Sequence, residues 1–334
     1  MVVLREGMCP GLSEELVGAL RTADITTVED LVSSDTEDLA QKCSVSYKAL
    51  LAVRRVLLAQ HTAFPVSGAD LYEDLLSSTA ILSTGSSRLD KLLDSGLYTG
   101  ELTELAGGPG SGKTQVCFAV TVHISYQLKQ SVIYIDTTGG MSASRLLQML
   151  QVKMCKMEEQ MEALQRIQVC RVFDIFSLLS CLHDLRCAGL QQMGGGSVKA
   201  VIVDSASAVI SPILGGKQNE GMSLMMQLAG VLKTIAKDFN VAVLVTNSVT
   251  RDGNGHLKAG LGLSWSHVPR TRVILERLQD PGLTCSSLRT ATLAKSSRQP
   301  CHLNEEFDLQ GWGRNEDQLH KVAGKRKLEN IHTS

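Results

Sequence analysis

The chain has 334 residues, of which 43% are hydrophobic and 20% charged, and its formal net charge is −1. Such a chain suits one large or two modest globular domains. It contains no run of 18 or more apolar residues, so we expect no membrane span. Its first residues lack the apolar stretch of a signal peptide. The nine cysteines include no C-x-x-C pair, which predicts reduced, mostly buried thiols in an intracellular protein and argues against a zinc site.

Charge divides the chain into two parts. Residues 1–80 carry 6 of the 33 Lys and Arg residues but 12 of the 34 Asp and Glu residues. An acidic N-terminal part therefore precedes a mildly basic remainder, which predicts different partners for the two parts. The acidic part is a poor docking surface for a nucleic-acid backbone, because the phosphates are also negatively charged.

Residues 1–60 are predicted to form a small bundle of four helices. A longer helix is expected over about residues 46–60, and three shorter helices are expected to begin at the capping side chains Ser13, Thr27 and Asp35. Such bundles often resemble helix-hairpin-helix modules, which grip DNA through a glycine-containing hairpin before the last helix. The segment 43–47 occupies that place and has no glycine. We therefore favour a protein-docking bundle over a DNA clamp.

Residues 61–83 read as a linker, because Phe64, Pro65 and Gly68 follow one another without a helical or strand period. Two interpretations of Phe64 are open. Its side chain can anchor in the pocket of a neighbouring protein, or the linker can add a strand to that protein's sheet. Alternatively, Phe64 packs on the bundle of its own chain.

From residue 84 the pattern changes to alternating strands and helices, which predicts a core over residues 84–313. Strands are expected at 101–106, 131–136, 167–173, 199–204, 241–247, 272–278, 289–294 and 302–309. Helices are expected at 87–97, 115–128, 142–151, 174–187 and 221–238, and the stretch 153–165 reads as an exposed helix or a long connection. Parallel βα units followed by β-hairpins make a three-layer α/β domain.

The segment from Gly107 to Thr114 matches G-x-x-x-x-G-K-[ST], the P-loop, between a predicted strand and a predicted helix. The expected nucleotide-binding residues are Gly107, Gly108, Pro109, Gly110, Ser111, Gly112, Lys113, Thr114 and Gln115. Glycines let the backbone bend so that several N–H groups converge on phosphate, and the helix dipole adds to the attraction. Lys113 would reach the β- and γ-phosphates, and Thr114 would supply a hydroxyl to Mg²⁺. The alternative is a glycine-rich turn followed by a chance Lys-Thr pair.

The second part of the same site is expected at Asp204, which ends the apolar run Val201–Asp204. Its carboxylate would emerge beside the P-loop and hold Mg²⁺ through water. ATP and Mg²⁺ are therefore the expected cofactors, with Thr114 and Asp204 as the metal residues. The alternative is an Asp that caps the turn after its strand.

These motifs resemble those of the RecA/RadA-type DNA recombinases, and among them most closely a D-type group of eukaryotic recombinase paralogues. The resemblance covers the chain from Pro10 to about Gly313 and is most specific at the segments 107–115, 134–136, 203–205, 245–247 and 261–265. It implies a small all-α N-terminal domain, a linker and a RecA-like P-loop ATPase core whose mostly parallel sheet lies between helices. In filament-forming members, ATP lies between neighbouring protomers, and two loops after the fourth and fifth core strands face DNA.

Two departures from the family pattern concern ATP hydrolysis. Members that hydrolyse ATP vigorously carry Glu where this chain has Thr138, at the end of what we expect to be the strand next to the P-loop strand. They carry Gln where this chain has Ser248. Because losing a general base or water-positioning group typically costs a factor of ~10²–10⁴, we expect ATP binding with weak hydrolysis unless a partner supplies the missing group. We therefore assign no catalytic residue.

The two loops that would face DNA, 211–221 and 249–262, contain few binding groups. Their basic residues are Lys217, Arg251, His256 and Lys258, and neither loop has an aromatic residue that could stack on a base. Stacking contributes ~1–3 kcal/mol per base. A single protomer is therefore expected to hold single-stranded DNA weakly, unless these loops contact nothing at all.

Two later groups are candidates for contacts with a neighbour. Trp265 and Arg272 can form an exposed aromatic and basic pair that contacts DNA or another subunit. Alternatively, Trp265 packs in the interior of its own chain. The resemblance places the stretch that holds Lys295 and Arg298 near the ATP of an adjacent subunit. These two residues are candidates for completing that subunit's site, and the alternative is a solvated basic loop.

The residues and the resemblance together favour an ATP-binding accessory protein in the homologous-recombination repair of DNA double-strand breaks. It would join other recombinase paralogues through its N-terminal domain and linker and through its ATPase core, and promote assembly of the main recombinase on single-stranded DNA. A disordered polar tail is expected at 314–334, where the basic run 325–327 agrees with a nuclear location. The alternatives are a self-assembling, DNA-stimulated strand-exchange ATPase and a P-loop small-molecule kinase, although no Arg-rich lid is visible.

Overall fold

The computed structural model describes residues 2–61, 67–188, 197–214, 218–251, 253, 257–278, 287–309 and 312. The chain divides into two compact units, Met1–Ser77 and Ser78–Ser334. No helix in the described part of the chain is long and apolar enough to cross a membrane. The expected disordered tail and Phe64 lie outside the described residues, as do Lys217 and His256.

The first unit contains the expected helical bundle. Its helices are α1 (Glu14–Thr22), α2 (Val28–Ser33), α3 (Thr36–Lys42) and α4 (Tyr47–His61). All three predicted caps are confirmed, because Ser13, Thr27 and Asp35 each accept a backbone N–H from the first turn of the following helix. Each cap is specified by a few adjacent residues, which explains why the sequence predicts these helices well.

The stretch expected to be a linker contains regular structure. The helix α5 (Gly68–Ser78) forms in it, and the short strand β1 (Ile81–Leu82) pairs with β2 (Leu97–Tyr98). A linker without secondary structure was therefore a wrong expectation for its second half. The apolar residues of α5 are all exposed, namely Leu71, Tyr72, Leu75 and Leu76.

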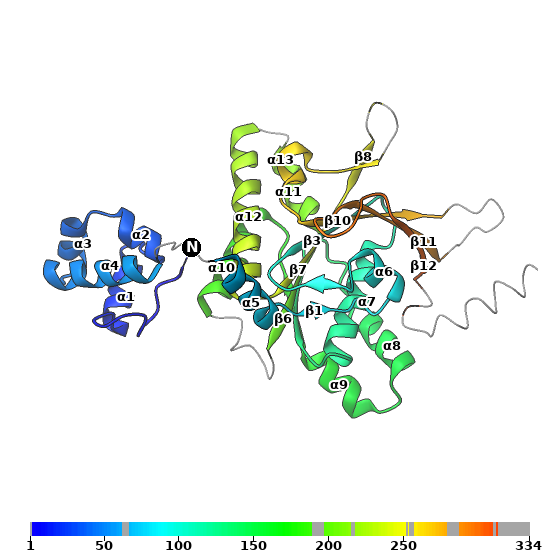
Figure 1. The fold of residues 1–334 in the computed structure, drawn as a ribbon, viewed down its shortest axis with the longest axis horizontal. Helices are drawn as coiled ribbons and strands as arrows, with labels where there is room; N and C mark the ends of the chain where they lie inside the picture. The colour runs from blue at the N-terminus through cyan, green and yellow to red at the C-terminus, as the bar shows by residue number, and fades with distance from the viewer. Residues whose placement is uncertain are drawn as a thin grey trace, which may run out of the picture. The chain divides into compact units, whose positions relative to one another are not determined.

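The second unit is built on an eight-stranded sheet with the order β12-β11-β10-β3-β7-β6-β4-β5 (Figure 1). Its strands are β3 (Leu102–Gly107), β4 (Ser131–Asp136), β5 (Ile167–Arg171), β6 (Val198–Asp204), β7 (Ala242–Asn247), β10 (Thr271–Arg277), β11 (Leu288–Lys295) and β12 (Asn304–Asp308). Neighbouring strands run parallel from β10 to β5, whereas β10, β11 and β12 pair antiparallel.

Helices cover both faces of this sheet, so the predicted three-layer α/β fold is confirmed. One face packs against α6 (Ser87–Leu92), α7 (Lys113–Tyr126), α8 (Ala143–Lys153) and α9 (Met157–Gln165). The other packs against α10 (Ile175–Ala188), α11 (Ala206–Leu214), α12 (Gln218–Asp238) and α13 (Gly262–Ser266). Within β4, Tyr134 joins the first core while Ile133 and Ile135 join the second. Burial on both faces explains why the strands read as continuous apolar runs.

Several local expectations need correction. The loop expected at 211–221 is shorter, because α11 extends to Leu214 and α12 begins at Gln218. The loop expected at 249–262 contains a hairpin of β8 (Val249–Arg251) and β9 (Leu257–Ala259). The helix expected at 87–97 ends at Leu92, and the stretch 153–165 resolves into the end of α8 and the helix α9.

Two further corrections concern sheet order and cysteine burial. The strand β4 does not lie next to the P-loop strand β3, because β7 and β6 lie between them. The cysteines are not mostly buried: among the described residues Cys9 and Cys117 are buried, Cys155 and Cys301 are exposed, and the others are half-buried. Sheet order and burial both depend on long-range packing, which the local pattern does not encode.

Candidate nucleotide-binding site

The P-loop connects β3 to α7 at the carboxyl edge of the sheet. Gly110 (φ 72°) and Gly112 (φ 101°) adopt the left-handed conformation that glycine reaches without a steric penalty. Gly112 is also the N-cap of α7. The first backbone N–H groups of a helix have no intrahelical acceptor, so this start of α7 is a preformed anion site.

Lys113 folds back on the loop. Its Nζ donates to the carbonyl oxygens of Gly107 (2.7 Å) and Gly108 (3.1 Å). Burial lowers the pKa of Lys113, and the negative charge of Asp204 opposes that shift. A phosphate group at the loop would offer Nζ a charged acceptor in place of the two neutral carbonyls.

Asp204, at the end of β6, is held by hydroxyl groups from the strands on both sides. The Tyr134 hydroxyl on β4 donates to Oδ2 (2.8 Å), and Thr246 Oγ1 on β7 donates to Oδ1 (2.5 Å). Burial and nearby negative charges raise the pKa of the Tyr134 hydroxyl, so it stays protonated and remains a donor. The carboxylate is thus oriented by side chains of the sheet rather than by the turn after its strand. Each of its oxygens retains a lone pair for the water of a metal ion.

Sequence reasoning missed Tyr134 and Thr246. Each places a hydroxyl group directly after a run of aliphatic residues within its strand, and that was the available signal. Gln115, which was also expected to contact the nucleotide, accepts a hydrogen bond from Arg145 Nε on α8 (3.1 Å).

Asp136 organises the loop that carries Thr138. Its carboxylate accepts four backbone N–H groups, those of Thr138 (3.1 Å), Gly139 (2.9 Å), Gly140 (3.2 Å) and Met141 (3.0 Å). Although burial opposes ionisation, these hydrogen bonds together hold the pKa of Asp136 below its usual range. Asp136 therefore stabilises the loop, and Thr138 offers only a hydroxyl group at an exposed position.

Ser248, which follows β7, is anchored to α11. Its backbone N–H donates to Ser207 Oγ (3.1 Å), and Ser207 Oγ lies 2.8 Å from Ser205 Oγ. Ser248 therefore offers only a short hydroxyl side chain at this end of β7.

Trp265 is fully buried, so of its two interpretations the structure supports packing. Its Nε1 donates to Glu104 Oε1 (2.8 Å), which also accepts from Asn247 Nδ2 (2.7 Å). Arg272 forms an ion pair with the same carboxylate. Glu104, buried on β3 just before the P-loop, was missed, although an acidic residue within an apolar strand was a visible signal.

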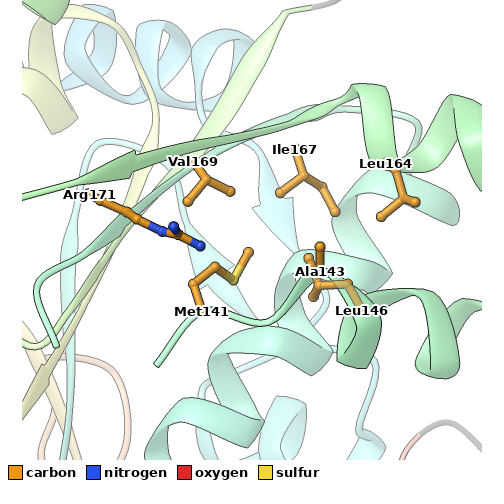
Figure 2. Close-up of a pocket in the computed structure, with 7 residues that line it drawn as sticks. All are labelled: Met141, Ala143, Leu146, Leu164, Ile167, Val169 and Arg171. Carbon is orange, nitrogen blue, oxygen red and sulfur yellow. The ribbon is translucent and has the colours of Figure 1, made fainter. Parts of the chain in front are cut away.

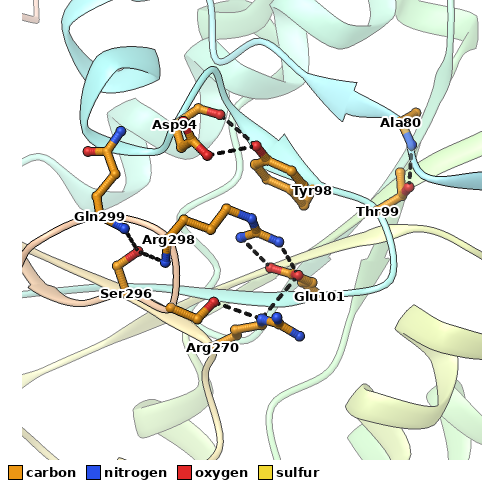
Figure 3. Close-up of polar contacts among 10 residues, drawn as sticks. Ala80, Asp94, Tyr98, Thr99, Glu101, Arg270, Ser296, Arg298 and Gln299 are labelled. Atoms are coloured by element: carbon orange, nitrogen blue, oxygen red, sulfur yellow. Dashed lines mark hydrogen bonds and ion pairs between the residues drawn. The ribbon is translucent and has the colours of Figure 1, made fainter. Parts of the chain in front are cut away.

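Arg298 is engaged within its own chain (Figure 3). Its guanidinium lies 3.5 Å from the centre of the Tyr98 ring, and Nη1 donates to Glu101 Oε2 (2.9 Å). Arg270 Nε lies 3.2 Å from Glu101 Oε1. Lys295 Nζ donates to a backbone carbonyl of α13 (2.9 Å). Both residues expected to reach a neighbour's ATP therefore make intramolecular contacts in this structure, and neither is a freely solvated base.

A cavity lies beside β5, the strand at one edge of the eight-stranded sheet (Figure 2). Its volume is about 540 Å³, and it is lined by Met141, Ala143, Leu146, Leu164, Ile167, Val169 and Arg171. All of these side chains except Arg171 are apolar. Val169 is 43% exposed, and Phe173, just after β5, is 63% exposed. An apolar cavity thus adjoins the outer edge of a strand.

Two family models match the chain. The model of the RAD51D N-terminal domain matches residues 1–60, and the Rad51 model matches residues 76–265. The DNA repair protein RAD51 homolog 4 of Mus musculus is 56% identical over 98% of this chain and 100% of its own length. The protein of the same name from Bos taurus is 57% identical over 94% of this chain and 97% of its own length.

A more distant relative also matches most of the chain. The DNA repair protein RAD51 homolog 2 of Homo sapiens is 27% identical over 86% of this chain and 83% of its own length. The Rad51 model covers the strands and helices from β1 to β9 and nearly all of α13, including the P-loop and Asp204. The chain therefore belongs to the Rad51 family, in the group of the RAD51 homolog 4 proteins.

Proposed function

We propose that this chain binds ATP with Mg²⁺ through residues 107–115 and Asp204, and that Thr114 and Asp204 face the metal ion. The P-loop at the start of α7, with Asp204 near enough for its negative charge to raise the pKa of Lys113 against the effect of burial, is the observation that supports this most strongly. The Rad51 family core implies nucleotide binding. Among the described residues, Ser111 Oγ is buried without a hydrogen-bond partner, as expected of a loop that awaits a ligand.

ATP would act mainly as a switch of assembly. Thr138 and Ser248 occupy positions at which the resemblance predicts Glu and Gln in family members that hydrolyse ATP. The chain therefore binds the nucleotide but orients an attacking water poorly. A bound γ-phosphate would order the loops at the edge of the sheet, and its release would relax them. Turnover by the isolated chain is therefore slow.

The chain would act in the nucleus in homologous-recombination repair of double-strand breaks. It would belong to a heteromeric complex of recombinase paralogues that promotes assembly of the main recombinase on single-stranded DNA. The names of its relatives, "DNA repair protein RAD51 homolog 4", support a role in DNA repair. Weak binding of single-stranded DNA by one protomer is consistent with the few basic residues of the hairpin β8–β9.

Two exposed apolar surfaces support docking of other family members on both units. In the first unit, α5 exposes 52–66% of Leu71, Tyr72, Leu75 and Leu76. In the core, the outer edge of β5 can accept an extended partner segment as an additional strand, with an apolar side chain in the adjacent cavity. Introducing a negative charge at this edge, as in Val169→Glu, should abolish co-purification of a partner that docks there, whereas Lys237→Glu on α12 should not.

The first experiment measures ATP binding with a fluorescent analogue and ATP turnover, with and without single-stranded DNA, on the purified full chain. We expect binding with turnover near background. Absence of binding would contradict the proposal outright. Strong DNA-stimulated turnover, together with filament formation by the pure chain, would instead favour a self-assembling strand-exchange ATPase.

A further inference from the structure

Arg289, on β11, lies against the outer side of the P-loop, although 178 residues separate it from Ser111. Its Nε donates to the carbonyl oxygen of Ser111 (3.1 Å), and its Nη2 donates to that of Gly110 (3.2 Å). A third donor, Nη1, reaches the carbonyl of Leu288 (2.8 Å). The residue is only 9% exposed, so packing fixes the direction of its guanidinium.

The contact with two loop carbonyls determines where two N–H groups point. A peptide unit is planar and trans, so its carbonyl oxygen and the N–H of the next residue point in opposite directions. The carbonyl of Ser111 shares a plane with the N–H of Gly112, and the carbonyl of Gly110 shares a plane with the N–H of Ser111. Holding these carbonyls from the outer side of the loop therefore turns the Gly112 N–H toward the phosphate position. It also stabilises the turn in which Ser111 N–H donates to the carbonyl of Gly108 (3.2 Å).

This restraint adds to the hydrogen bonds within the loop, and it matters because glycines leave the loop backbone free to adopt other conformations. Gly110 and Gly112 have positive φ values and no side chains, so many backbone conformations are open to them. The neighbouring Leu309 adds a steric restraint, since a Cβ atom on Gly112 would lie 2.8 Å from its Cδ1. The hairpin of β11 and β12 thus holds the P-loop, although no residue of the motif comes from it.

We infer that Arg289 is a positioning residue for nucleotide phosphates in this chain. It orients the backbone N–H groups of the P-loop through their carbonyls and places a buried positive charge behind the anion site. The inference rests on the proposed binding of ATP, because it concerns the same site. It assigns to the β11–β12 hairpin a role in nucleotide binding that the P-loop motif does not predict.

The test compares the full-length wild type with Arg289→Met, which removes all donors, and Arg289→Lys, which keeps the charge but can satisfy fewer carbonyls. The matched control is Lys91→Gln, because Lys91 pairs with Glu305 on the same hairpin (2.5 Å) and its loss removes one positive charge. Two quantities are measured, the Kd for Mg²⁺–ATP and the thermal midpoint with and without saturating ATP. The second quantity separates stabilisation by the nucleotide from the stability of the empty protein.

We expect Arg289→Met to raise the Kd about tenfold or more and to reduce the ATP-induced rise of the midpoint, since two charge-assisted hydrogen bonds are lost. Arg289→Lys should lie between it and the wild type, and Lys91→Gln should match the wild type. If Arg289→Met does not fold, Arg289→Lys decides: a wild-type Kd overturns the inference and a raised Kd supports it. A lower midpoint of the empty protein with an unchanged Kd would show a purely structural role and overturn it as well. A wild type that fails to bind ATP would instead overturn the proposed function.

Discussion

The P-loop and the two loops that follow β4 and β7 lie at the same edge of one sheet, yet they differ in the chemistry they offer. The P-loop presents Lys113 and the start of α7 to an anion, and Asp204 lies within electrostatic reach. The other two loops present only the hydroxyl side chains of Thr138 and Ser248, where the resemblance predicts Glu and Gln in members that hydrolyse ATP. This comparison predicts a site that binds ATP and orients an attacking water poorly.

Hydrogen bonds nevertheless hold the backbone of the two loops that carry Thr138 and Ser248. Asp136 holds the loop after β4 through four backbone N–H groups, and Ser207 holds the N–H of Ser248. The difference from the P-loop is therefore one of side-chain chemistry, while the backbone of all three loops is supported. This contrast favours a core in which ATP acts by being bound, and the following changes test it.

The largest effect is expected for Lys113→Ala. Removing a partly buried charged donor to phosphate costs ~2–5 kcal/mol, so the Kd for ATP should rise about hundredfold, at 1.4 kcal/mol per tenfold. The fluorescent-analogue titration measures it. Lys237→Ala is the control, because Lys237 lies in the last turn of α12, which leads into the start of β7, whereas the P-loop follows the carboxyl end of β3. Equal affinities for both variants would mean that the P-loop is not the nucleotide site.

Placing Glu and Gln at positions 138 and 248 tests whether these two loops limit ATP hydrolysis. We expect the double variant Thr138→Glu/Ser248→Gln to raise ATP turnover about tenfold, because a water-positioning group contributes up to ~10²–10⁴ when fully aligned. Steady-state phosphate release measures this, with the Kd for ATP as the control that should stay constant. Unchanged turnover with intact binding would show that these two positions do not explain slow hydrolysis.

A smaller effect is expected for Tyr134→Phe. Losing the donor to Asp204 Oδ2 costs about 1 kcal/mol, so the Kd for Mg²⁺–ATP should rise about fivefold, whereas the Kd without Mg²⁺ should stay constant. Thr121→Val is the matched control, since this buried hydroxyl donates within α7 to the carbonyl of Cys117 (2.7 Å). A loss of affinity that is independent of Mg²⁺ would refute the assigned role of Tyr134 in orienting Asp204.

An effect of similar size is expected on the pH dependence of stability, through Asp136. Because its pKa in the folded protein is below the unfolded value of about 3.9, the carboxylate contributes stability above that pH. This contribution is lost as the pH falls through the folded pKa. We expect Asp136→Asn to destabilise the core by about 1 kcal/mol at pH 6, and the difference from wild type to shrink below pH 4. Denaturant unfolding at pH 6 and pH 3 measures it, and a constant difference would argue against the carboxylate's role.

The sequence by itself determined the parts whose signals are local. Ser13, Thr27 and Asp35 predicted three helix starts, because a cap bonds only to N–H groups two or three residues away. The P-loop was recognisable because its residues are consecutive and stand between a strand and a helix. The alternation of strands and helices was equally visible, since each element carries its own period or apolar run.

The tertiary structure alone decided which distant side chains share a site. Arg289 reaches the P-loop across 178 residues, and Tyr134 reaches Asp204 across 70. In strands that are buried on both faces, apolar residues on both sides hide the direction of each side chain from the sequence pattern. The burial of Trp265 against Glu104 and the pairing of Arg298 with Glu101 were also open, because each joins residues more than 150 positions apart in the sequence. Contacts between strands depend on sheet order, and sheet order is set by the packing of the whole core.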